Sequence, residues 1–137
     1  MSKPTTISHM TFIVKDIEKS AQLFIQLLGA KEVYDSHAKN FSLSHEKFLL
    51  IDDLWIALME GNSLPERTYN HIAFKIDEAN FSTYLEKIEA LGLEIKDGRS
   101  RIAAESKSIY FYDYDNHLFE LHTGTLEERL KGYCEEK

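Results

Sequence analysis

The chain has 137 residues, 43% of them hydrophobic and 28% charged, with a formal net charge of −7. The length fits one compact unit or two very small ones, and the composition excludes collagen-like, low-complexity and disordered classes. The acidic balance argues against nucleic-acid binding, whose affinity comes from basic side chains on phosphates. No apolar run approaches the roughly 18 residues of a membrane span. With no apolar leader at the N-terminus, we expect no membrane association and a cytoplasmic location. The single cysteine, Cys134, excludes an intrachain disulfide.

The chain contains an internal repeat. Three blocks recur in one order: His9–Asp16 at His71–Asp77, 62 residues on, then Leu28–Ala30 at Leu91–Leu93 and Trp55–Gly61 at Leu118–Gly124, both 63 residues on. Such self-similarity indicates a repeated structural unit. We therefore predict two copies of one module, about residues 8–61 and 70–124, within a single domain spanning 1–137.

The first module begins with a strand from His9, in which alternate side chains share a face. A helix is predicted over about Ile17–Leu28, since its apolar residues recur at helical spacing. Asp16 is placed to accept a hydrogen bond from the first turn, and Gly29 to end the helix in the left-handed conformation.

The second module repeats this order. Its helix is predicted over about Phe81–Leu91, followed by strands at about Leu93–Lys96, Ser108–Tyr112 and Leu118–His122. The turn between the last two strands contains Asn116, which tolerates a positive φ. The result is an α+β chain of two β-α-β-β-β modules. Each helix covers one face of its sheet, and the other faces are predicted to form a cup that holds a ligand.

Three residues on the predicted open faces form a candidate metal site. His9 and His71 are repeat equivalents, and Glu120 corresponds to Ala57. Two imidazoles and one carboxylate with vacant positions are typical of a catalytic metal site. His122 shares the face of Glu120 and is the alternative ligand, although its distance along the strand favours a supporting hydrogen bond. Each histidine taken alone also fits an ordinary polar strand residue.

Longer stretches carry a resemblance to a known family. Residues 41–48 (FSLSHEKF), 66–74 (ERTYNHIAF) and 108–130 closely resemble the fosfomycin-resistance epoxide hydrolases of the FosX type, within the vicinal oxygen chelate superfamily. The resemblance implies a vicinal oxygen chelate fold and a Mn²⁺-dependent enzyme that opens the epoxide of fosfomycin with water. Zn²⁺, Fe²⁺ and Ni²⁺ are also compatible with this ligand chemistry.

The resemblance also implies roles for individual residues. His9, His71 and Glu120 match the metal ligands, and Glu46 matches the general base. The residues that match the substrate pocket are Thr11, Trp55, Arg101, Ser108, Tyr110 and Arg129. From the local pattern alone, Glu46 equally fits a solvated polar turn, Arg129 a helix surface, and the two aromatic residues an ordinary core.

Two alternative functions remain open at this point. The same metal site fits transfer of a thiol to the epoxide, and the same fold fits a protein that binds a drug without chemistry. Glu46 and the complete ligand set favour hydrolysis over both. The resemblance further implies a homodimer in which His9 of one chain meets His71 and Glu120 of the other. The loop around Ala103–Lys107 departs from the family pattern, so it bears on efficiency or substrate choice.

Overall fold

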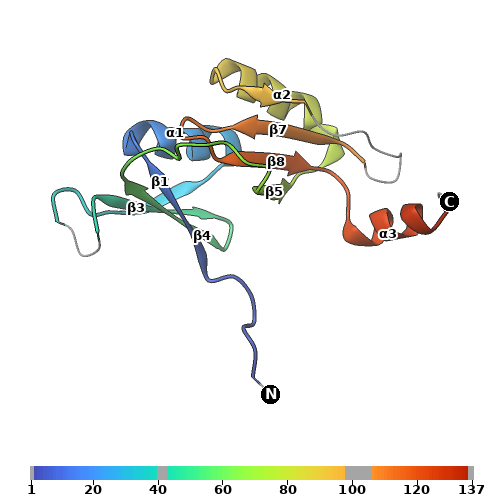
Figure 1. Cartoon of the computed structure of the whole chain (residues 1–137), viewed down its shortest axis with the longest axis horizontal. Coiled ribbons are helices and arrows are strands. Elements are labelled where there is room, and N and C mark those ends of the chain that lie inside the picture. Colours follow the sequence, from blue (N-terminus) through green and yellow to red (C-terminus); the bar gives the residue numbers. More distant parts are fainter. Residues whose placement is uncertain (1, 40–42, 98–105, 136–137) are drawn as a thin grey trace. The chain divides into compact units, whose positions relative to one another are not determined.

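The computed structural model describes residues 2–39, 43–97 and 106–135. It divides into two compact units, Met1–Pro65 and Glu66–Lys137. Each unit contains one four-stranded sheet, and the β-α-β-β-β order appears in both (Figure 1). The predicted α+β fold of two repeated modules is therefore confirmed.

Unit 1 has strand order β1-β4-β3-β2. Its elements are β1 (His9–Val14), α1 (Ile17–Leu28), β2 (Lys31–Asp35), β3 (Glu46–Ile51) and β4 (Leu54–Glu60). Unit 2 has the matching order β5-β8-β7-β6. Its elements are β5 (His71–Lys75), the 3-10 turn η1 (Glu78–Asn80), α2 (Phe81–Ala90), β6 (Ile95–Lys96), β7 (Ser108–Tyr112), β8 (Leu118–His122) and α3 (Leu126–Glu135). None of the described helices has the length and apolar character to cross a membrane.

The strand register reproduces the repeat residue by residue. In unit 1, β1 runs parallel to β4 and pairs Thr11 with Ala57. In unit 2, β5 runs parallel to β8 and pairs Ala73 with Glu120. Glu120 therefore occupies the position that Ala57 holds in the first module, as the sequence predicts.

Helix α1 has the predicted ends. The side chain of Asp16 accepts a hydrogen bond from the backbone N–H of Lys19 at 3.1 Å. Gly29 adopts φ +67°, and its N–H donates to the carbonyl of Ile25. A glycine suits this left-handed position because it has no Cβ to clash.

The segment after α2 differs slightly from the prediction. Strand β6 begins at Ile95 rather than Leu93, because the N–H of Leu93 still donates to the carbonyl of Ile88 and completes the end of the helix. Leu93 is buried there. An apolar side chain that closes a helix end is easily mistaken for the start of a strand.

The sheet of unit 1 has two distinct faces. Phe12 stacks on Phe24 of α1, and Lys47 forms an ion pair with Glu18 of the same helix. Alternation along the strands then places His9 and Thr11 of β1, together with Glu46 of β3, on the opposite face. We call this the open face of unit 1.

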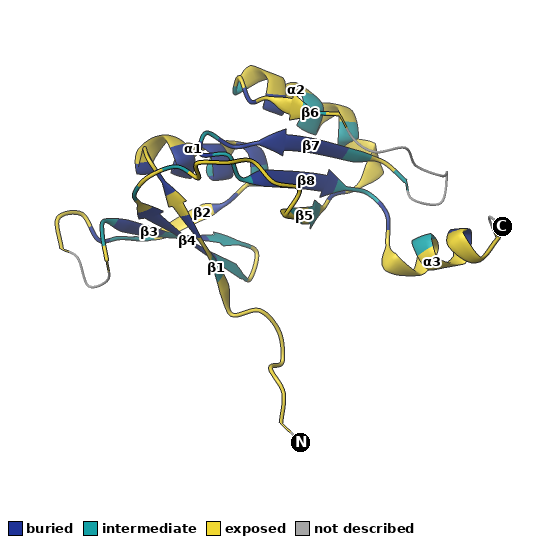
Figure 2. Cartoon of the chain, in the orientation of Figure 1, coloured by how far each residue is buried: buried dark blue, intermediate teal, exposed yellow. Residues whose placement is uncertain are grey.

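Each unit has its own apolar core, and in unit 2 strands β7 and β8 are mostly buried (Figure 2). In unit 1, Phe24 is among the largest fully buried side chains.

We expect Phe24→Ala to lower the free energy of unfolding by about 3–5 kcal/mol, because it removes buried apolar surface and leaves a cavity. Urea unfolding measures the change. Phe24→Leu should lower the free energy of unfolding clearly less than Phe24→Ala does. Equal decreases in the two variants would contradict a tightly packed core around Phe24.

Candidate metal centre and active site

The centre of the site in unit 2 is a contact between His71 and Glu120. The Nε2 atom of His71 lies 3.0 Å from Oε1 of Glu120. His71 begins β5 and Glu120 is in the middle of β8, and the two side chains share one face of that sheet. The Glu120 carboxylate is almost fully buried. A buried carboxylate requires partners or a cation, because its desolvation is costly.

The hydrogen bond of the other ring nitrogen of His71, Nδ1, bears on the role that Nε2 has in the contact with Glu120. Nδ1 lies 2.7 Å from the backbone carbonyl of Tyr69, so Nδ1 carries the proton and donates it. A protonated ring would form an ion pair with the carboxylate, whereas in a ring protonated at Nδ1 alone Nε2 is a lone-pair acceptor facing a carboxylate oxygen. A cation between them resolves this arrangement, and two ligands about 2.1 Å from one ion at a right angle lie about 3 Å apart. The donor set therefore fits a divalent metal.

The second carboxylate oxygen of Glu120 is held by Ser108. The Ser108 hydroxyl donates to Oε2 of Glu120 at 2.5 Å and lies 2.7 Å from Nδ1 of His122. Because a serine hydroxyl has one proton, His122 must be the donor in the second contact. His122 therefore contacts the candidate ligand both directly, at 3.3 Å, and through Ser108. This is the supporting hydrogen bond that the strand spacing favours.

Tyr110 lies beside both candidate ligands of unit 2. It pairs with Glu120 across the β7–β8 ladder, and its ring meets the His71 ring edge-on, with centroids 5.4 Å apart. Its hydroxyl accepts a hydrogen bond from the Tyr69 hydroxyl at 3.2 Å. An aromatic wall with a polar tip at this place suits a small, partly polar ligand.

A small cavity lies at the start of α3. Its volume is about 200 Å³, and it is lined by His122, Gly124, Thr125, Leu126 and Arg129. Thr125 accepts the N–H of Glu128 through its hydroxyl and so begins the helix, which places Arg129 on the first turn. At Gly124 a Cβ atom would lie 2.9 Å from Nε2 of His122, so a larger residue would require the His122 side chain to shift. The cavity thus combines a guanidinium with an imidazole that contacts Glu120.

Unit 1 presents His9 on its open face. The His9 ring stacks on Trp55, with centroids 4.1 Å apart, and the two residues are register partners on β1 and β4. The indole Nε1 of Trp55 is buried and has no hydrogen-bond partner within the part of the chain that the structure describes. A buried donor without a partner is costly, so this atom suggests a ligand or protein group not present in unit 1.

Glu46 is the buried carboxylate on the open face of unit 1. Only 8% of the residue is exposed, so the interpretation of this segment as a solvated turn is wrong. Glu46 pairs with Met59, which in turn pairs with Ile13. Its Cα therefore lies two strands across and four residues along from His9, a separation of roughly 16 Å. At that separation the two side chains cannot share an ion, but a small substrate fits between them.

Of the remaining predicted site residues, one lies within the described part of the chain and one does not. Thr11 lies on the open face of unit 1, between the register positions of His9 and Glu46. Arg101 and most of the Ala103–Lys107 loop lie outside the described residues. The meeting of His9 with His71 and Glu120 stays a prediction, because His9 belongs to unit 1 and the other two residues belong to unit 2.

A different acidic group in unit 1 also has the geometry of a metal site. Ligand atoms of Glu18, Asp35 and His45 lie within 4.8 Å of one another. However, Nζ of Lys47 lies 3.2 Å from the Glu18 carboxylate and 3.1 Å from that of Asp35. The lysine ammonium already provides the positive charge that a metal ion would bring, so this group is an ion-pair cluster.

Sequence reasoning missed two supporting residues in the segment before β5. Tyr69 provides the carbonyl that orients His71. Arg67 donates to both carboxylate oxygens of Glu94 and to the side chain of Asn116, and its guanidinium lies 3.9 Å from the centroid of the Tyr112 ring. These contacts tie the segment to unit 2 ahead of His71. The available signal was the cluster of polar and aromatic residues just before a predicted ligand.

Comparison with known proteins establishes the class. Residues 6–121 match the family model of the Glyoxalase/Bleomycin resistance protein/Dioxygenase superfamily, and the chain belongs to that superfamily. The match spans most of both units, and paired β-α-β-β-β modules with a histidine and glutamate centre agree with it.

Within this superfamily, the chain is similar to fosfomycin resistance proteins and to a metallothiol transferase. The chain is 58% identical to the fosfomycin resistance protein FosX of Listeria innocua over 93% of this chain and 96% of that protein. A crystal structure of a glutamate-to-glutamine variant of FosX from Listeria monocytogenes, complexed with Mn(II) and 1S,2S-dihydroxypropylphosphonic acid, superposes with a TM-score of 0.88 at 52% identity, covering 96% and 99% of the two chains. Metallothiol transferase FosB of Staphylococcus saprophyticus is 38% identical over 96% of this chain and 85% of that protein.

Proposed function

We propose that this protein is a metal-dependent hydrolase that adds water to the epoxide of fosfomycin and so confers resistance to it. The diol in the Listeria monocytogenes FosX complex is the compound that such an addition yields. The observation that carries the proposal is Glu46, a buried carboxylate on the same open face as His9. A buried carboxylate at this place suits a general base for water.

The metal would be held by His9, His71 and Glu120, and Mn²⁺ is the ion bound in the related structure. When bound, Mn²⁺ supplies a Lewis acid that stabilises the negative charge that develops on the epoxide oxygen. Ser108 and the Tyr69 carbonyl orient Glu120 and His71 toward it. Such supporting contacts raise the affinity of a metal site.

Glu46 performs the proton transfer. Its carboxylate takes a proton from water as the water oxygen forms a bond to an epoxide carbon. The bond from that carbon to the epoxide oxygen breaks, the oxygen takes a proton from solvent to give the vicinal diol, and Glu46 returns its proton to solvent. The roughly 16 Å between the Cα atoms of His9 and Glu46 leaves room for a small substrate between a metal at His9 and the base, which supports this assignment.

The phosphonate requires cationic and hydroxyl partners. Arg129 provides a forked donor that matches phosphonate oxygens, and its cavity adjoins His122. Ser108, Tyr110, Thr11 and Trp55 complete the proposed pocket, with the Trp55 N–H available to a ligand. Arg101 is proposed as a further basic contact.

Thiol transfer to the same epoxide is the second candidate, since the chain also resembles metallothiol transferase FosB. Glu46 favours hydrolysis, because water needs a base more than a thiol does. A labelling experiment in H₂¹⁸O without added thiol separates the two. We expect one ¹⁸O atom in the diol measured by mass spectrometry, and a product that forms only with thiol would overturn hydrolysis.

We also propose a homodimer whose two sites are shared between chains, acting in the cytoplasm. Mixing His9→Ala chains with Glu120→Ala chains tests the sharing. Each mixed dimer then has one site with all ligands intact, so subunit exchange should restore about a quarter of wild-type activity if pairing is random. Sedimentation at micromolar concentration should show a dimer. A fully active monomer, or no recovery on mixing despite exchange, would contradict the proposal.

A further inference from the structure

The backbone around Glu46 is held on its β2 side by a single residue. The N–H of Glu46 donates to the Ser36 hydroxyl at 2.9 Å, and its carbonyl accepts the N–H of Ser36 at 3.0 Å. Ser36 follows the last residue of β2, so Glu46 lies at the very end of the β2–β3 pairing. On its other side Glu46 pairs with Met59 of β4. Strand ends open more easily than strand centres, so the β2 side of Glu46, with these two bonds, is the weaker side.

A cluster of charged side chains surrounds the buried Lys47 on the opposite face of the same strand. Nζ of Lys47 lies 2.8 Å from the Glu32 carboxylate, 3.1 Å from Asp35 and 3.2 Å from Glu18. Only 3% of Lys47 is exposed. We call these four residues the Lys47 cluster. It joins β3 to β2 and to α1.

The charges of Lys47 and Asp35 are stabilised by their surroundings. Burial alone would lower the pKa of Lys47, but the hydrogen bonds that its ammonium donates to Glu32, Asp35 and Glu18 raise the pKa above its ordinary value. The N–H of His37 and hydrogen bonds from His45 and Lys47 hold the pKa of Asp35 well below its usual range, despite its burial.

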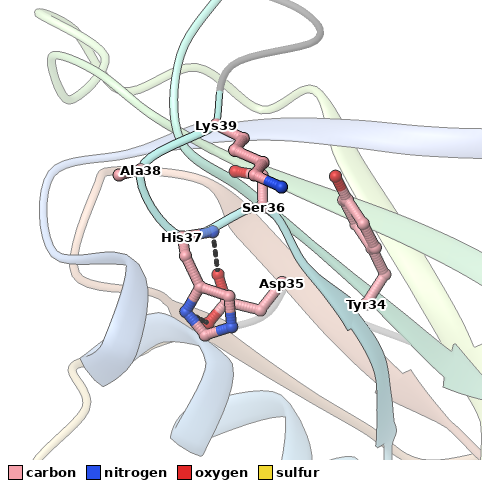
Figure 3. A pocket seen from close by; sticks show the side chains of 6 residues that line it. All are labelled: Tyr34, Asp35, Ser36, His37, Ala38 and Lys39. Atoms are coloured by element: carbon pink, nitrogen blue, oxygen red, sulfur yellow. Dashed lines mark hydrogen bonds and ion pairs between the residues drawn. The ribbon is translucent and has the colours of Figure 1, made fainter.

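Asp35 also connects the cluster to the residue before Glu46. Its Oδ1 atom lies 2.7 Å from Nε2 of His45 and accepts the N–H of His37 at 2.7 Å, a bond drawn in Figure 3. This turn lies beside a hollow of about 430 Å³ lined by Tyr34, Asp35, Ser36, His37, Ala38 and Lys39. The side chains on both sides of Glu46, from His45 and Lys47, thus converge on one carboxylate.

The local register explains why such an anchor is needed. The β2–β3 pairing shifts between Glu32 and Tyr34, so β2 contains an irregularity just before the Glu46 end. Strand β3 keeps its faces through its full-length pairing with β4. A slip of one residue between β2 and β3 would instead displace β2 and remove Ser36 from the backbone of Glu46. A buried ion pair contributes little net stability, but buried polar groups can specify register.

We infer that Lys47 is a positioning residue for the reaction: by binding Glu32, Asp35 and Glu18 on the helix side of the sheet, it fixes the β2–β3 register that keeps Ser36 against the backbone of Glu46 and so holds the end of β3 that carries the base. This inference rests on the proposed function, in which Glu46 is the general base. It adds a role for a residue that touches neither substrate nor metal.

Lys47→Met tests the role by removing the ammonium while keeping a long side chain. We expect kcat for diol formation to fall about 10- to 100-fold, because small displacements of a catalytic group have effects of this size. KM for fosfomycin and the Mn²⁺-induced rise in melting temperature should change little. Lys47→Arg should restore part of kcat. Asp35→Asn, which is nearly isosteric, provides a second variant if Lys47→Met folds poorly.

A readout independent of activity is amide hydrogen exchange followed by NMR. The amides of Ser36 and Glu46 should exchange at least about 10-fold faster in Lys47→Met, because the strand end opens more often. The amide of Ile76, which donates to the His122 carbonyl in unit 2, should be unchanged. Ile88→Val is the matched control, a core change in unit 2 that lowers stability without touching β3.

A double-mutant cycle separates this inference from the proposed function. If Lys47 acts through Glu46, Lys47→Met should lower kcat little further in a Glu46→Gln background. An equal loss of kcat in both backgrounds, or unchanged exchange at Ser36 and Glu46, would overturn the positioning role while leaving the base assignment in place. Full activity of Glu46→Gln by itself would remove the base assignment, and this inference with it.

Discussion

Glu46→Gln is expected to lower the rate of water addition by about 10²-fold or more, the typical effect of removing a positioned general base. The amide is nearly isosteric with the carboxylate, and the backbone bonds of Glu46 to Ser36 do not involve its side chain. Folding, Mn²⁺ binding and fosfomycin binding should therefore persist. Steady-state kinetics of diol formation without thiol, with thermal shifts for both ligands, measures each part of this expectation.

Glu86→Gln is the matched control for Glu46→Gln. It removes the same charge from an exposed position on α2, far in sequence from the candidate residues. Its activity should equal that of the wild type. Undiminished diol formation by Glu46→Gln would show that another group activates water. Loss of Mn²⁺ binding in Glu46→Gln would instead indicate a role in holding the metal.

Glu120→Ala is expected to abolish both activity and the stabilisation by Mn²⁺. A ligand that binds only the folded protein stabilises it by about 2.7 kcal/mol at 100 times its Kd. For a chain of this size that raises the melting temperature by several degrees. The variant lacks the carboxylate that lies 3.0 Å from His71, so the rise should disappear. Differential scanning calorimetry with and without Mn²⁺ measures it.

Glu86→Ala controls for the loss of a glutamate and should keep the full Mn²⁺ effect. Glu120→Ala also leaves Ser108 and His122 without one partner each, so its melting temperature without metal serves as its own baseline. An undiminished rise with Mn²⁺ in Glu120→Ala would exclude Glu120 as a ligand. His122→Ala would then be the next variant to measure.

The helix ends, the turn between β7 and β8 and the repeat could be predicted because short stretches of sequence specify them. Asp16 and Gly29 define the two ends of α1, and the structure has both caps. Asn116 adopts φ +70° in the predicted turn between β7 and β8. The repeat supplied the equivalence of Ala57 and Glu120, because two modules with one strand order must share one register.

The features that local sequence did not predict depend on contacts between distant segments. The segment Ser44–Lys47 is polar, and a strand that buries a glutamate on one face and a lysine on the other resembles a turn by composition. The lysine is buried only because Glu18, Glu32 and Asp35, from 12 to 29 residues earlier, surround its ammonium. No periodicity within β3 contains that information.

The role of Ser108 shows a similar limit. Resemblance assigns it to the substrate pocket, and the strand pattern places it beside Glu120 without showing what its hydroxyl binds. In the structure the hydroxyl donates to Glu120 and accepts from His122, so one residue connects the candidate ligand to a second histidine. Side-chain hydrogen bonds of this kind follow from geometry that sequence spacing alone does not specify.

The central claim, water addition to the epoxide with a divalent metal, is tested most directly by ³¹P NMR of fosfomycin incubated with the protein and Mn²⁺ in the absence of any thiol. We predict that the fosfomycin resonance is replaced by that of 1,2-dihydroxypropylphosphonate, and that EDTA prevents the change. A fosfomycin resonance that persists under these conditions, or that disappears only after a thiol is added, would contradict the account.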